Sequence, residues 1–167
     1  MRKSVMILLP AAVLALAGLI LHAEEGVKWL DPQNCHFCKP LAETEGLMEH
    51  VNWENYKIAN GMVSVTTYAP EWAEKAKAAS AAMKKLWDEY DPTVEVHMCG
   101  MCQAWMQMPM DKIKMESVDF TGGELSLTTS DDPAIVARMH EIVDKTVAAM
   151  AVMMTEMEEK TEAEAEE

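Results

Sequence analysis

The chain contains four cysteines, and they form two Cys-x-x-Cys pairs that are its best candidates for chemistry. The pairs are Cys35 with Cys38 and Cys99 with Cys102. Two thiolates at this spacing reach the same point from a tight turn or a helix start, so each pair can grip a metal ion. The same spacing also suits thiol–disulfide exchange, and exported proteins use cysteines for structural disulfides. The pairs therefore indicate a metal centre, a redox site or a disulfide cross-link.

Each pair opens one copy of an internal repeat. The shift that carries Met48 onto Met110 places residues 48–75 on residues 110–137 without a gap. Asn60-Gly61 then falls on Gly122-Gly123, and each dipeptide suits the two central positions of a β-hairpin turn, which need positive φ. Because the duplicated unit carries its cysteines with it, we interpret the thiols as the working part of the protein.

The repeat predicts an α+β protein made of two tandem units packed about a pseudo-twofold axis. In each unit a Cys-x-x-Cys is followed by a short helix, a β-hairpin and a longer helix, so that helices cover an antiparallel sheet. Residues 71–90 and the segment that begins at Pro133 have helical patterns. Residues 93–98 predict a further strand leading into the second pair, with residues 27–30 as its shorter counterpart.

The second half thus has the order strand, Cys-x-x-Cys, helix, strand, turn, strand and helix. Residues 94–144 carry several matching features: Cys99 and Cys102 after a predicted strand, strands over residues 116–120 and 125–129, Gly122-Gly123 between them, and Asp131-Asp132-Pro133 at the next helix start. In these features the segment resembles a heavy-metal-associated domain, a small ferredoxin-like module that carries soft metals such as Cu(I). The resemblance implies a loop-borne Cys-x-x-Cys that binds one soft ion and hands it on.

The two ends of the chain differ from its middle. Arg2 and Lys3 precede an apolar run from residue 5 to residue 21, which predicts an export signal that is cleaved from the mature chain. The alternative is an uncleaved membrane anchor. The predicted divisions are a signal peptide over residues 1–23, the first repeat over 24–92, the second repeat over 93–155, and an acidic tail over 156–167. We therefore expect an exported protein, either periplasmic or secreted.

The charge of the chain narrows the range of partners. The formal net charge is -14, and loss of residues 1–23 removes two positive charges and no acids. A strongly negative protein is repelled by nucleic acid and by anionic membrane surfaces. We therefore expect neither as a partner, and another metal-handling protein of the cell envelope is the macromolecular partner that the motifs suggest.

The cysteines allow two metal stoichiometries. In one, the repeats bring all four sulfurs to a single tetrahedral site; in the other, each pair holds its own ion with help from a neighbouring side chain. No histidine is repeated, so a symmetric site uses sulfur alone. The candidate additional ligands flank the thiols or lie on the last helix: His97, Met98, Met101 and His140. For His140, packing within a helix is an equally good interpretation.

The expected metal is soft, and Cu(I) and Zn(II) both suit four thiolates. Six methionines within residues 98–115 favour Cu(I), since thioether is a soft ligand, although methionine also fills apolar cores. Met106, Met108 and Met110 belong to this group. We interpret the chain as a binding protein for Cu(I) buffering, delivery or sensing, with structural zinc as the alternative.

Two other interpretations of the cysteines remain, and both rank below metal binding. Cys99-Gly100-Met101-Cys102 resembles a thioredoxin active site, but the repeated unit is short for that framework. The cysteines could also be plain structural disulfides. No set of residues suggests catalytic turnover, so we do not expect an enzyme. The later methionine stripe, which reaches Met157, suits either a core or a homodimer surface.

Overall fold

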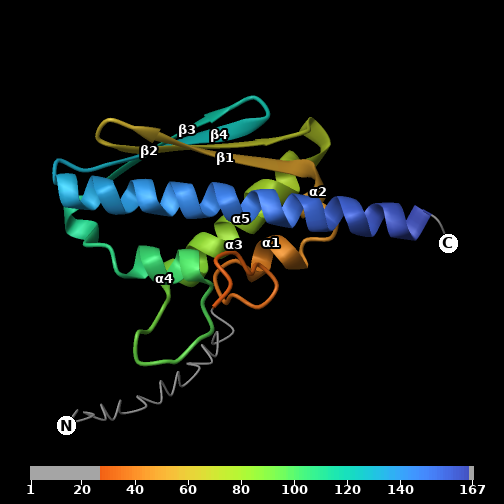
Figure 1. The fold of residues 1–167 in the computed structure, drawn as a ribbon, viewed down its shortest axis with the longest axis horizontal. Helices are drawn as coiled ribbons and strands as arrows, with labels where there is room; N and C mark the ends of the chain where they lie inside the picture. Colours follow the sequence, from red (N-terminus) through yellow and green to blue (C-terminus); the bar gives the residue numbers. More distant parts are fainter. Residues whose placement is uncertain (1–26, 166–167) are drawn as a thin grey trace, which may run out of the picture.

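The computed structural model describes residues 27–165, and Figure 1 shows its arrangement. The predicted signal peptide lies outside the described residues. Four strands are present: β1 (Val51–Ile58), β2 (Gly61–Tyr68), β3 (Lys114–Phe120) and β4 (Gly123–Thr129). Five α-helices accompany them: α1 (Lys39–Glu43), α2 (Leu47–His50), α3 (Ala73–Asp88), α4 (Gly100–Met106) and α5 (Pro133–Ala165). Two short 3₁₀ helices, η1 (Pro70–Trp72) and η2 (Met110–Lys112), precede α3 and β3.

The strands form one antiparallel sheet in the order β1-β2-β4-β3, which confirms the predicted α+β class with an antiparallel sheet. The two hairpins pair in equivalent registers under the sequence shift, since Asn52 faces Thr67 and Lys114 faces Thr129. The hairpins join along β2 and β4, where Ser64 lies opposite Ser126. Ser64 and Ser126 are equivalent positions of the two repeats, so the two hairpins pair symmetrically.

The predicted hairpin turns are wrong by one residue. Ile58 pairs with Gly61 and Phe120 pairs with Gly123, so the loops are residues 59–60 and 121–122. The glycines at the strand starts serve close packing instead. A Cβ on Gly61 would lie 2.0 Å from the carbonyl oxygen of Thr128, and a Cβ on Gly123 would lie 2.2 Å from that of Thr66. Glycine is needed here because the neighbouring strand leaves no room for a side chain.

The strand predicted over residues 93–98 is also wrong, as is its counterpart over residues 27–30, because the structure forms neither. Their backbone groups bond to the cysteine-bearing loops. The amide of Gly100 donates to Lys28 and that of Met101 donates to Trp29, at 2.9 and 3.0 Å. The amide of His36 donates to the carbonyl of His97 at 2.9 Å. The described sheet therefore consists of two hairpins, with no strand leading into either Cys-x-x-Cys.

Helix α5 lies across one face of the sheet, and α1, α3 and α4 lie on the far side of α5 (Figure 1). Its apolar stripe packs on the sheet through a core of five buried residues: Met62, Met108, Ile135, Met139 and Val143. No described element covers the opposite face, where Tyr56, Val118 and Phe120 are exposed. Within residues 27–165, none of the helices combines the length and apolar character that a membrane span needs.

The close approach of β2 and β4 generates a stability prediction. Gly61→Ala and Gly123→Ala should each lower the free energy of unfolding by about 2–3 kcal/mol, because the methyl group meets a backbone carbonyl that cannot rotate away. Denaturant titration of each variant would measure the loss. Gly122→Asn measures the effect of turn strain alone, since Gly122 has φ +89° but the nearest atom to its Cβ is 3.5 Å away. Its loss should be smaller, because asparagine tolerates positive φ better than other side chains do. A loss as large in Gly122→Asn would assign the effect to the turn rather than to the strand contact.

Candidate metal centre

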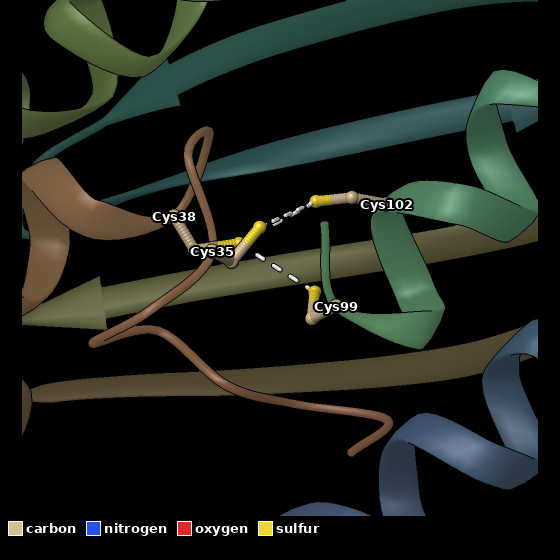
Figure 2. Close-up of side chains that lie close together, drawn as sticks. All are labelled: Cys35, Cys38, Cys99 and Cys102. Carbon is tan, nitrogen blue, oxygen red and sulfur yellow. Dashed lines mark hydrogen bonds between the residues drawn. The ribbon is translucent and has the colours of Figure 1, made fainter. Parts of the chain in front are cut away.

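All four cysteines meet in one place, although they come from two segments far apart in the chain. Figure 2 shows their side chains pointing toward one another from the loop before α1 and from the start of α4. The Sγ atom of Cys102 lies 3.6 Å from that of Cys35 and 3.5 Å from that of Cys38, and the Cys38–Cys99 distance is 4.0 Å. All four sulfurs lie within 4.8 Å of one another. Every one of these residues is at most 5% exposed, and all four are free thiols.

Both Cys-x-x-Cys segments form a single helical turn, which turns the two thiols toward the same point. The amide of Lys39 donates to the carbonyl of Cys35, and that of Gln103 donates to Cys99. In the second segment the chain approaches Trp29 so closely that a Cβ on Gly100 would lie 2.9 Å from its ring. Glycine at this position therefore allows residues 27–30 to pack against the site.

Aromatic side chains close the site on the side of α3. Phe37, between the first two cysteines, is fully buried and stacks on Trp87 with ring centroids 4.0 Å apart. Tyr90 meets the Phe37 ring edge-on at 5.3 Å. The other side chains packed against the cysteines are apolar: Leu86, Val96, Met98 and Met101. The thiols thus lie in a low-dielectric setting in which an isolated charge is costly.

The thiols do not ionise independently. Hydrogen bonding to Cys102, and after it to Cys38 and Cys99, lowers the pKa of the Cys35 thiol. Hydrogen bonding to Cys102 is also the main cause that lowers the pKa of Cys99 to about 6. Hydrogen bonding to Cys35 first, and then to Cys38 and Cys99, raises the pKa of Cys102. Cys35 and Cys99 therefore lose their protons more readily than a free cysteine does. Cys102 holds its proton, because that proton bonds to the neighbouring sulfurs and because burial opposes a further thiolate.

The donor set and its spacing fit one tetrahedral metal ion. Zinc–thiolate bonds of about 2.3 Å place the sulfurs of a regular tetrahedron about 3.8 Å apart. The three Sγ–Sγ distances given above, 3.5 to 4.0 Å, bracket that value. A cation at the centre also removes the repulsion that opposes full deprotonation. The arrangement therefore favours the single shared site over two separate ones.

The two histidines proposed as additional ligands lie outside this cluster, which contains only cysteines among residues 27–165. His97 has a side chain 56% exposed, and its Nε2 is 3.6 Å from the carboxylate of Asp31. His140 packs on the sheet, with Nε2 3.0 and 3.1 Å from the carbonyl oxygens of Ile58 and Gly61. Nε2 can serve these carbonyls only as an N–H donor, so the structure places His140 as a packed helix histidine away from the thiols.

The methionine candidates separate into two groups. Met98 and Met101 pack against the cysteines, as expected from their positions beside the thiols. Met106 and Met110 are exposed, and Met108 is buried in the core between α5 and the sheet. The sequence reasoning missed Phe37 and Trp87 as the cover of the site, although an aromatic residue inside the Cys-x-x-Cys was a visible signal.

Comparison of the chain with models of protein families, with curated proteins and with solved structures finds no match in any of the three.

The aromatic cover generates a prediction for the centre. Phe37→Ala should lower the free energy of unfolding by about 3–5 kcal/mol, because it leaves a cavity beside the thiols and removes the stack on Trp87. Thermal unfolding, followed by near-ultraviolet circular dichroism, would measure the loss. Val94→Ala is the control, since Val94 is 53% exposed. Equal stability of the two variants would show that the aromatic cover does not support the centre.

Proposed function

We propose that this chain is a soft-metal-binding protein in which four cysteine thiolates hold one ion, Zn(II), that ties its two halves together. The observation that carries the proposal is the convergence of four buried thiols within 4.8 Å. The partners that close the site are 61 to 67 residues apart in the chain. An ion shared by such distant segments contributes its binding energy to folding.

The geometry supports zinc because the protein supplies the complete ligand set. Structural zinc sites are four-coordinate and closed, whereas catalytic sites keep one position open for water or substrate. The four thiols can fill a tetrahedron, and no more than 5% of any of these residues is exposed. This burial also weighs against thiol–disulfide exchange, which needs a thiolate that a partner can reach.

The proposal includes export, as residues 1–23 predict. A bound metal ion would keep the thiols from oxidation in the compartment that the exported protein reaches. Free thiols in an oxidising compartment form disulfides. Metal-bound thiolates are held apart and neutralised, so a resident ion protects them. We also infer that the two halves are copies of one unit, each supplying one Cys-x-x-Cys, and the matching hairpin registers support this inference.

Cu(I) is the second candidate, because two thioethers lie beside the thiols. Met98 and Met101 both pack against the cysteine cluster, and thioether sulfur is a ligand for Cu(I) but not a usual one for zinc. In that case the protein buffers, delivers or senses copper in the cell envelope. The identity of the ion separates the two candidates directly.

Native mass spectrometry tests the shared site. The mature chain, purified without oxygen, should carry one metal ion, and Cys35→Ser/Cys38→Ser should lose it completely. Cys99→Ser/Cys102→Ser should lose it too, because two sulfurs cannot replace four. His97→Ala is the control and should retain the ion, since its side chain is largely exposed. One ion remaining in either double variant would contradict the shared site, and a chain that lacks metal and carries disulfides would overturn the proposal.

Metal competition separates zinc from copper. If zinc is the resident ion, Met98→Leu/Met101→Leu should leave metal content and affinity unchanged, because the substitutions keep volume and remove only thioether sulfur. If Cu(I) is resident, the same variant should bind Cu(I) more weakly in competition with a Cu(I) chelator. Met106→Leu/Met110→Leu is the control, since both methionines are exposed. Weaker zinc binding in the first variant alone would contradict the assignment of a purely thiolate zinc site.

A further inference from the structure

A cavity of about 790 Å³ lies beside the cysteine centre, between the ends of β1 and β2, helices α1 to α3, and the second half of α5. It shares Cys38 and Met101 with the wall of the centre. Six methionines line it: Met48, Met83, Met101, Met150, Met153 and Met154. Met150, Met153 and Met154 of α5, whose spacing suggested a core or an interface, thus face a space that the described residues do not fill.

The size and the lining of the cavity suit an organic molecule. Ligand pockets usually have volumes of about 300–1,000 Å³ and are lined mainly by apolar and aromatic side chains. Trp53 and Tyr68 add aromatic surface to the methionines. Methionine is unbranched and polarisable, so a methionine-lined wall adapts to ligands of different shapes. The space is far larger than a single metal ion needs.

The charged groups around the cavity indicate which charge the bound molecule should carry. Of the described residues that line it, none is lysine or arginine, two are carboxylates, Asp31 and Glu49, and one is a histidine, His50, whose ring stacks on Trp72. Asp31 is already engaged, since its carboxylate accepts hydrogen bonds from Asn34 and lies near His97. Glu49 is exposed and forms no ion pair within residues 27–165. The net charge of -14 adds a long-range attraction for cations.

We propose that this cavity binds an organic cation with an apolar body. The apolar body packs among the methionines and Trp53, and the positive group pairs with the carboxylate of Glu49. Lys75 does not line the cavity and instead lies over the Trp72 ring at 4.4 Å, so its charge is held outside the site. The proposal does not depend on which metal the cysteines hold, because the group that pairs with the cation, the Glu49 carboxylate, is not among the proposed metal ligands.

Calorimetry on the full mature chain, with its metal retained, tests this site with two probes that differ in charge. Decyltrimethylammonium and decyl sulfate are titrated below their micelle concentrations. The cation should bind with saturation at one molecule per chain and about tenfold more tightly than the anion, because Glu49 attracts one and repels the other. Glu49→Gln should weaken cation binding about two- to fivefold, as expected for a partly exposed ion pair. Equal binding of the two probes, or no saturable binding of the cation, would overturn the proposal.

Matched variants locate the site. Met153→Trp places a bulky ring in the cavity and should abolish binding, whereas Val147→Trp, on an exposed position of the same helix, should not. Glu95→Gln controls for net charge, since Glu95 is exposed and does not line the cavity. An effect of Glu95→Gln as large as that of Glu49→Gln would overturn the proposal, because it would assign the selectivity to overall charge. If Met153→Trp does not fold, the two glutamate variants still decide, since both are surface substitutions.

Discussion

The crowding of four thiols into one buried space is the constraint on which the rest of the structure depends. Each thiolate placed there repels the others, and the surrounding side chains are apolar, so the protein alone cannot neutralise a fully deprotonated cluster. Yet the backbone brings the two loops together through direct bonds, such as that from the amide of His36 to the carbonyl of His97. The metal ion proposed above would resolve this conflict, since a central cation attracts every thiolate.

Helices connect the sheet with the cysteine centre. Trp29, which packs on the second Cys-x-x-Cys, donates from Nε1 to the buried hydroxyl of Thr146 on α5 at 3.0 Å. On the other side, Trp87 of α3 stacks on Phe37 in the first Cys-x-x-Cys. One aromatic side chain thus ties each cysteine segment to a long helix. A change in the positions of the cysteine segments should therefore alter the packing of α3 and α5, and through α5 that of the sheet.

The cysteine centre is rigid, whereas the wall of the neighbouring cavity is adaptable. The thiols are held by a helical turn, by short loops and by stacked rings, so their positions are closely defined. The cavity wall consists largely of methionines, whose side chains have three rotatable bonds and adapt their packing. Because Cys38 and Met101 belong to both walls, the cysteine centre fixes one side of an otherwise adaptable space. This arrangement combines a stable frame with a surface that accommodates different shapes.

Local pattern was sufficient for features that depend on neighbours in the sequence. The two hairpins follow from alternating residues around a turn, and the pairing of Cys35 with Cys38 follows from one helical turn. The exact turn positions could not be predicted from local pattern. Glycine is required at positions 61 and 123 because a carbonyl of a neighbouring strand leaves no room for a side chain, and not because these residues form the turn. Nor did the loop character of residues 93–98, whose backbone bonds were decided by a segment much earlier in the chain, as in the contact of His97 with His36.

The sequence by itself determined that this chain has two thiol pairs, two hairpins of matching pattern and a strongly acidic character. Only the tertiary structure decided that all four thiols meet, that His140 bonds to the sheet instead of joining them, and that the methionines in the second half of α5 face a cavity. The physical reason is distance along the chain. Side chains three or four residues apart are positioned by backbone geometry, whereas Cys38 and Cys99 meet only because every element between them packs in one particular way.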